Sequence, residues 1–182
     1  MDADRYGNVD KVGSYVEAAL TPAQWRYRLP FFASVHGPPD EPVIIHGNSS
    51  AVMEQELKYA SDFGIDFWAF VAYPPPSKMF YAQELYLQIT DRTQSTRVKF
   101  CVVMDGNQLS VLGRDTPRII SYFKRSSYQK VLGGRPLVFT FISAAWPASA
   151  LANLTKATVE AGLPAPYVTR PMHGQSQLTI IL

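Results

Sequence analysis

The stretch GIDFWAFVAY, residues 64–73, decides the fold of this chain. Apart from Asp66 near its start it is apolar and rich in aromatic residues, which favours an extended strand. It shows no alternation of polar and apolar residues, and such strands are usually buried on both faces, as in parallel sheets. An amphipathic helix is expected before it, and three prolines at 74–76 stop regular structure after it. The sequence therefore predicts a parallel sheet built from βα repeats.

More strands and helices are expected on both sides of this stretch. The other strands are expected at 29–35 (LPFFASV), 98–104 (VKFCVVM), 136–142 (PLVFTFI) and 167–172 (YVTRPM). The helices are expected at 50–63, at 79–89, from Thr116-Pro117 onward, and at 149–161. With right-handed crossovers, five strands alternating with four helices give a parallel sheet with its helices outside. This pattern fits either an open doubly wound sheet or the first part of a (β/α)8, TIM-like barrel.

Other parts of the chain carry weaker patterns. A short helix is expected at 12–20, and Thr21-Pro22 is expected to open a further turn through Trp25. Short extended or turn segments are expected at 43–45 and 127–132. We treat residues 1–182 as a single α/β domain with an N-terminal extension, 1–28, and a tail, 173–182, whose apolar end LTIIL has no predicted place.

Composition excludes several classes of protein. With 182 residues, 47% of them hydrophobic, the chain can build one substantial core. The 17 basic and 15 acidic residues are mixed along the chain, so no nucleic-acid partner is expected. Neither a signal peptide nor a membrane-spanning segment is found, which predicts a cytoplasmic protein without a membrane partner.

The sequence offers little for a metal or a cofactor. Cys101 is the only cysteine, which excludes disulfides and cysteine-based zinc sites, and its apolar surroundings predict a buried core thiol. The three histidines, His36, His46 and His173, are too scattered to suggest a metal site. Neither GxGxxG nor GxxxxGK[ST] occurs, which argues against a nucleotide-binding sheet. No metal and no cofactor are expected.

Several motifs together resemble one family. They are TPAQW (21–25), LPFF (29–32), MEQELKYASDFGIDFWAFVAYP (53–74), VKFCVVMD (98–105), ISYFKRSSYQKVLGGRPLVFTF (120–141) and AGLPAPYV (161–168). They resemble the opening part of the barrels similar to glycoside hydrolase family 99, the endo-α-mannosidase-like group. The resemblance implies an incomplete TIM-like barrel of about five strands that acts on or binds polysaccharide or glycan. A complete barrel takes about 250 residues.

The resemblance assigns no catalytic residue. In the endo-α-mannosidase relatives the catalytic glutamates lie late in the barrel, and the chain ends before that region. Whether the chain is an enzyme is therefore left open. A non-catalytic carbohydrate-binding or structural remnant is one alternative, and an unrelated small α/β protein is another.

Candidate site residues follow from the position of ligands in barrels, at the carboxyl ends of the strands. The residues near the expected strand ends are His36, Tyr73, Asp105, Asn107, Trp146, Arg170 and His173. Tyr73 and Trp146 can stack on a sugar ring. We expect substrate binding by these two together with Asp105, Asn107 and His173.

Asp105 is the weak candidate for a catalytic acid or base. Its alternative role is that of a turn residue in Asp-Gly that bonds its own backbone. Glycosidases need two carboxyl groups, roughly 5–5.5 Å apart for retention or 6.5–9.5 Å for inversion. Asp40 and Glu41 would complete a pair only if their loop folded over the site, so the sequence shows no complete pair.

Assembly is expected from the edges of an incomplete barrel. The first and last strands of such a sheet expose unpaired N–H and C=O groups. An open inner face, formed by Phe31, Phe70, Val102 or their neighbours, would also expose apolar surface. The sequence thus predicts a homo-oligomer, with the fifth strand and the LTIIL tail in contact. In the alternative, residues 1–28 cover the open side.

Overall fold

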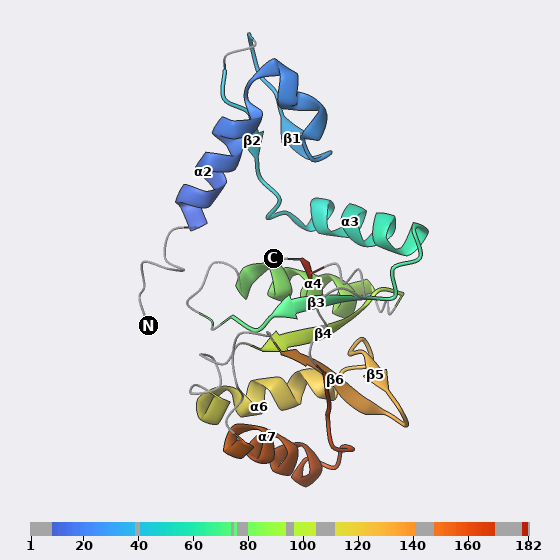
Figure 1. Ribbon diagram of the computed structural model, residues 1–182. Coiled ribbons are helices and arrows are strands. Elements are labelled where there is room, and N and C mark those ends of the chain that lie inside the picture. The colour runs from blue at the N-terminus through green and yellow to red at the C-terminus, as the bar shows by residue number, and fades with distance from the viewer. Residues whose placement is uncertain are drawn as a thin grey trace. The chain divides into compact units, whose positions relative to one another are not determined.

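A computed structural model describes residues 9–38, 41–73, 75, 80–93, 97–104, 112–140, 148–169 and 180–181. The chain divides into two compact units. The N-terminal unit comprises Met1–Glu56 and Pro75–Ile89, and the sheet unit comprises Leu57–Pro74 and Thr90–Leu182. The elements of both units are labelled in Figure 1.

The N-terminal unit begins with α2 (Val9–Leu20) and the 3-10 helix η1 (Ala23–Arg28). Two short strands follow, β1 (Ala33–Ser34) and β2 (Ile44–Ile45), which pair antiparallel. The helix predicted at 12–20, the turn after Thr21-Pro22 and the extended piece at 43–45 are confirmed.

The parallel strand predicted at 29–35 is wrong. The Ala33 N–H donates to the Pro30 carbonyl (2.9 Å), which closes a turn where an extended strand was expected. Only Ala33 and Ser34 pair, with Ile45 and Ile44 of β2, in a separate two-stranded sheet.

Two helices cross the boundary between the units, α3 (Ser50–Asp62) and α4 (Phe80–Thr93). The α3 helix starts as predicted, because the Ser49 hydroxyl accepts a hydrogen bond from the Val52 N–H (3.2 Å). It ends at Gly64, whose φ of +75° suits glycine. None of the described helices is long and apolar enough to cross a membrane.

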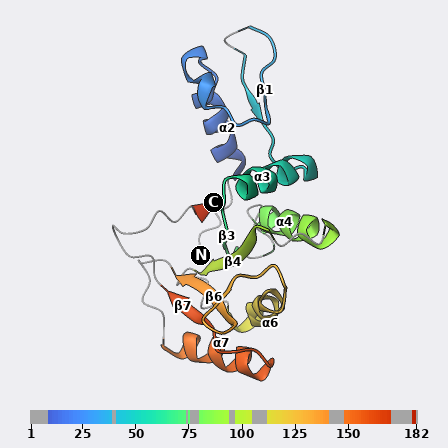
Figure 2. The same cartoon turned by 90° about the vertical axis from the view of Figure 1, so that its right-hand side faces the viewer.

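The described residues of the sheet unit form five parallel strands. They are β3 (Phe67–Val71), β4 (Lys99–Met104), β6 (Arg135–Thr140), β7 (Tyr167–Thr169) and β8 (Ile180–Ile181). Figure 2 shows β3, β4, β6 and β7 side by side in the order of the sequence. The β5 strand (Lys130–Val131) pairs antiparallel with the start of β6. The predicted α/β class with a mostly parallel sheet is therefore confirmed.

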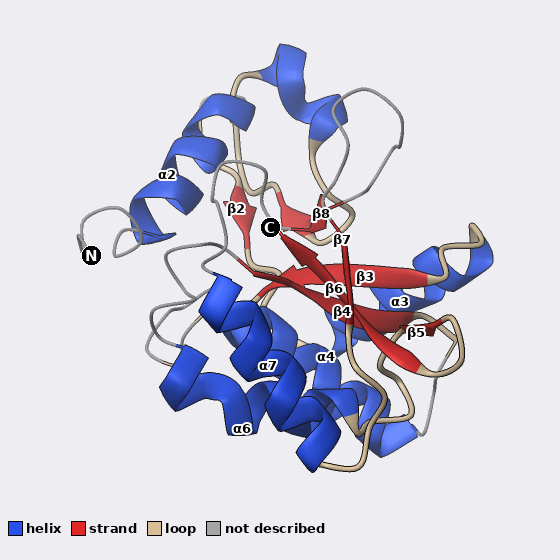
Figure 3. Cartoon of the chain, turned by 60° about the horizontal axis from the view of Figure 1, so that its bottom comes forward, coloured by secondary structure: helices blue, strands red, loops and turns tan. Residues whose placement is uncertain are grey.

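Two further helices connect these strands after α4, which lies between β3 and β4 in the sequence. They are α6 (Leu112–Phe123), between β4 and β6, and α7 (Ala148–Glu160), between β6 and β7. Because successive strands are added in one direction, right-handed crossovers place both helices on one face. Figure 3 shows α6 and α7 together on that side of the sheet. The α6 helix begins at Leu112, earlier than the predicted Thr116, so that Pro117 lies inside it.

The tail supplies a strand that the sequence did not place. Ile180 and Ile181 of β8 pair in parallel with Ala69 and Phe70 of β3. This position on the outer side of β3 is the one that the predicted strand at 29–35 would occupy in a barrel. Ile180 and Ile181 of the LTIIL tail are thus paired within their own chain, whereas the sequence predicted the tail as a contact between copies.

Both faces of the central strands are buried, as the apolar runs predict. Every residue of β3 and β4 is buried except the first of each strand, which is half-buried. On one face Phe100 contacts Tyr122 of α6, with ring centroids 5.9 Å apart. On the other, the rings of Phe67 and Phe139 stack at 6.3 Å.

The inner face predicted from Phe31, Phe70 and Val102 is wrong. Phe31 lies in the N-terminal unit. Phe70 and Val102 are aligned in register, and the Phe70 ring contacts Phe100 on the face that α6 covers. All three residues were predicted to lie on the face of the sheet away from the helices.

Tyr128 holds β4 and β6 together where they diverge. Residues 127–129, predicted to form a turn, lie between the two strands: the Phe100 N–H donates to Ser127 and the Leu137 N–H to Gln129. The Tyr128 hydroxyl donates to the Leu137 carbonyl (2.7 Å) and accepts from the Val102 N–H (3.3 Å). One buried side chain thus satisfies a backbone group on each strand.

Candidate functional site

The carboxyl ends of β3, β4, β6 and β7 lie at one edge of the sheet because the strands are parallel. At this edge the structure places Tyr73, two residues beyond β3. The Ala72 N–H still donates to Val103 of β4 (2.9 Å), and the Tyr73 N–H turns back to the Val71 carbonyl (2.8 Å). The Tyr73 side chain is half-buried. An aromatic ring is therefore present where the sheet ends, as predicted.

The other predicted binding residues, Asp105, Asn107, Trp146 and His173, lie outside the described residues, as do Asp40 and Arg170. In the sequence, Asp105 follows the last residue of β4 directly, and Trp146 and His173 come after β6 and β7. That these side chains join Tyr73 stays a prediction.

His36 and Glu41 belong to the N-terminal unit, where both are exposed. His36 was predicted at the carboxyl edge because it follows an expected parallel strand, and this basis is wrong, because the strand before it, β1, belongs to a separate antiparallel pair. The Glu41 carboxylate lies against Gly37, so closely that a Cβ on Gly37 would clash with it.

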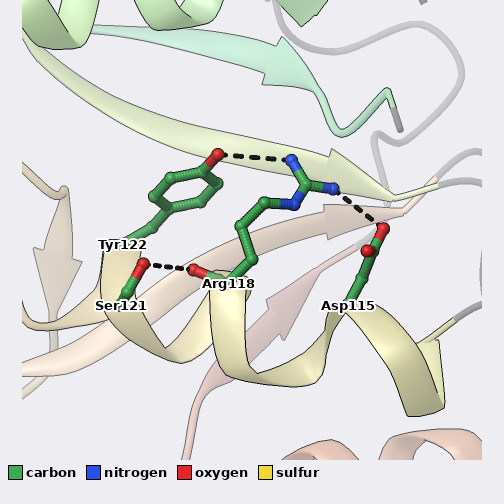
Figure 4. Close-up of polar contacts among 4 residues, drawn as sticks. All are labelled: Asp115, Arg118, Ser121 and Tyr122. Carbon is green, nitrogen blue, oxygen red and sulfur yellow. Dashed lines mark hydrogen bonds and ion pairs between the residues drawn. The ribbon is translucent and has the colours of Figure 1, made fainter. Parts of the chain in front are cut away.

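A polar cluster that the sequence analysis missed extends along α6 from Asp115 to Tyr122 (Figure 4). Arg118 Nη2 donates to the Asp115 carboxylate (2.9 Å), and Arg118 Nη1 donates to the Tyr122 hydroxyl (3.2 Å). The Ser121 hydroxyl donates to the Arg118 carbonyl (2.7 Å). The spacing Asp-x-x-Arg is a helical i,i+3 pair, which could have been found had α6 been predicted to start at Leu112.

The residues of this cluster stabilise the helix that carries them. Burial lowers the pKa of Arg118, but its hydrogen bonds to Tyr122 and Asp115 outweigh burial and raise the pKa overall. The guanidinium therefore stays charged, and the Asp115 carboxylate is engaged as its counter-ion. Asp115 lies in the first turn of α6, where its ion pair with Arg118 stabilises the start of the helix.

Cys101 and Thr140 are two further buried side chains of the sheet unit. Burial raises the pKa of the Cys101 thiol, so the predicted buried core thiol is confirmed and a reactive one is excluded. The Thr140 hydroxyl, on the last residue of β6, is buried and has no hydrogen-bond partner. Among the described residues, no group of three or more His, Cys, Asp or Glu side chains could hold a metal ion.

Comparison with known proteins gave no relative: no protein-family model matches the chain, and neither a curated protein nor a solved structure matches it. The function must therefore be inferred from the residues and their arrangement.

Proposed function

We propose that this chain is a glycoside-hydrolase-like α/β domain that binds polysaccharide or glycan at the carboxyl edge of its parallel sheet. The observation that carries the proposal is the strand order. β3, β4, β6 and β7 follow one another across the sheet, with α6 and α7 on one face. Strands of a (β/α)8 barrel are arranged in this way, whereas a doubly wound sheet carries helices on both faces. That the sheet is part of a TIM-like barrel is likewise proposed.

Tyr73 supplies the contact with sugar in this proposal. A phenol ring offers an apolar face to the C–H groups of a pyranose and a hydroxyl to its polar rim. The position of Tyr73 just beyond β3 matches the place where barrels bind their ligands. Asp105, Asn107 and His173 are proposed as partners for sugar hydroxyls, and Trp146 as a second stacking ring.

We further propose that the chain binds glycan without hydrolysing it. Hydrolysis needs a pair of carboxyl groups. Asp105 alone cannot act as both acid and nucleophile, and Asp115 is committed to Arg118. Release of reducing ends from a glycan by the purified chain, abolished by Asp105→Asn, would contradict this part of the proposal.

Binding is tested by titrating neutral hexasaccharides of mannose, glucose and xylose into the chain and following heat or amide NMR shifts. Tyr73→Ala should weaken the binding about 2- to 10-fold, because stacking on an aromatic ring contributes about 0.5–1.5 kcal/mol. Tyr73→Phe keeps the ring and should retain most of the affinity. Tyr81→Ala, which removes an exposed tyrosine of α4, is the matched control.

The proposal fails if no hexasaccharide binds to the unaltered chain. It also fails if Tyr73→Ala binds as tightly as the Tyr81→Ala control.

A further inference from the structure

A second group of exposed side chains lies on η1 in the N-terminal unit. Trp25 and Tyr27 are 39% and 76% exposed. Their ring centroids are 6.5 Å apart, with an angle of 42° between the ring planes. The Arg28 guanidinium carbon lies over both rings, 5.5 Å from the Trp25 centroid and 5.8 Å from that of Tyr27. We call these three residues the η1 cluster.

The local sequence fixes the η1 cluster in place. A 3-10 helix has three residues per turn, which puts Trp25 and Arg28 on the same side. Pro22 starts the turn, and its carbonyl accepts from the Trp25 N–H (2.8 Å). The Thr21 hydroxyl donates to the backbone carbonyl of Glu17 in α2 (2.8 Å) and accepts from the Val43 N–H beside β2 (3.2 Å). The cluster is therefore carried on a turn that is tied to two other elements.

The two arginines of η1 have different surroundings. Arg26 is half-buried, and its Nε donates to the Thr21 carbonyl (3.0 Å). Arg28 is exposed, and no hydrogen bond or ion pair joins it to any described residue. The ring faces hold its guanidinium by cation–π attraction, within the roughly 6 Å at which this attraction acts. Because the rings occupy the face of the guanidinium, the N–H groups along its edge remain available.

No acidic residue lies near Arg28 in the sequence. The Glu17 carboxylate, on the adjoining helix, is engaged in a hydrogen bond from the Ile45 N–H (2.8 Å). Between residues 18 and 38 the sequence contains Arg26 and Arg28 and no acidic residue. A guanidinium with free N–H groups binds a carboxylate with two parallel hydrogen bonds.

We infer that the η1 cluster is a binding site for acidic carbohydrate, a chain of uronic acid residues. A hexuronate carries on one ring both the carboxylate that suits Arg28 and the flat C–H face that suits Trp25 or Tyr27. An acidic peptide offers the carboxylate without that rigid face. The carbohydrate nature of the ligand rests on the proposed function, and the inference adds a second site and the charge of its ligand.

The test uses hexagalacturonate, a neutral hexasaccharide and hexaglutamate, each titrated into the full chain at low and high salt. Arg28→Gln should weaken hexagalacturonate binding about 10- to 150-fold, since a hydrogen bond to a charged group contributes about 1.5–3 kcal/mol. Trp25→Ala should weaken it several-fold, and salt should weaken it in the unaltered chain. Arg97→Gln removes an equal charge from another exposed arginine and should leave binding unchanged. Circular dichroism checks that each variant is folded, and Trp25→Leu, which also lacks a flat aromatic face, replaces Trp25→Ala if the latter is not.

Three results would overturn the inference. The first is an equal loss of affinity in Arg28→Gln and Arg97→Gln, which would indicate attraction by net charge alone. The second is binding of hexaglutamate as tightly as hexagalacturonate, without loss in Trp25→Ala, which would indicate a peptide site. The third is the absence of hexagalacturonate binding.

The same titrations separate the two sites. Neutral hexasaccharide binding that depends on Tyr73 and not on Arg28 supports the site at the sheet edge. Hexagalacturonate binding that depends on Arg28, with no binding of neutral sugar, supports the η1 cluster and contradicts the site at Tyr73.

Discussion

Cys101 and Tyr128 are ionisable groups buried in the sheet unit, and burial raises the pKa of each. For Tyr128 the nearby Cys101 raises the pKa further, while the hydrogen bond from Val102 lowers it. Both groups therefore stay protonated in the folded chain at a pH where the unfolded chain loses protons, from their usual values of 9.0 and 10.0 upward. Their contribution to the free energy of unfolding is full below about pH 9 and falls as the pH rises beyond it.

We accordingly expect thermal melting temperatures to fall between pH 8.5 and pH 10.5. The decrease should be smaller in Cys101→Ala, which has no thiol to ionise. An identical pH dependence in the variant and the unaltered chain would contradict a role for the thiol.

The hydroxyl of Tyr128 makes a separate prediction possible. Tyr128→Phe leaves the Val102 N–H and the Leu137 carbonyl without this partner in a buried place. We expect the free energy of unfolding to fall by about 1–3 kcal/mol, as is usual for buried polar groups that lose their partner. Urea denaturation measures it, with Tyr81→Phe on an exposed tyrosine as the control. A midpoint as high as that of the control would contradict the bridging role.

At the scale of the element, β8 offers the clearest test. Deleting Leu178–Leu182 removes both of its residues and uncovers the outer edge of Ala69 and Phe70 in β3. Exposed strand edges promote association. We expect the deletion variant to unfold at lower urea concentration and to aggregate more readily. Ile180→Val, which keeps strand propensity, should behave like the unaltered chain, and Ile180→Pro like the deletion. Unchanged stability on deletion would contradict the pairing.

A strand or helix can be predicted from the sequence when its own residues determine it, and not when it depends on a distant part of the chain. β3 and β4 could be predicted because continuous apolar runs indicate strands that are buried on both faces. The ends of α3 and α7 could be predicted because Gly64 and Gly162 take positive φ there. β8 could not be placed because its two residues pair with a strand far away in the sequence.

The remaining errors also have local causes. The strand at 29–35 was wrong because its apolar residues resemble a core strand, while a turn closed on Pro30 leaves Phe31 half exposed. Of the candidate site, the sequence correctly placed Tyr73 after a strand. It could not reveal the contact of Arg118 with Asp115, which depends on where α6 begins.

For the whole molecule, the open edges of the sheet and the exposed apolar side chains of the N-terminal unit bear on assembly. β7 pairs with β6, and no described residue pairs with its other edge. In the N-terminal unit, Tyr15, Tyr27 and Phe31 are all at least half exposed. We expect a dimer or larger oligomer, because such edges and patches are usually covered. Light scattering over a range of concentrations measures it, and a monodisperse monomer at the highest concentration would contradict it.

The pairing of β8 with β3 also affects how the protein is made. Phe70 and its partner Ile181 are 111 residues apart in sequence. At about 5–20 residues per second, roughly 5–20 seconds of synthesis separate the two strands. During this interval the growing chain presents the Phe67–Val71 strand without its last neighbour. Slower growth at low temperature should therefore favour the recovery of folded protein.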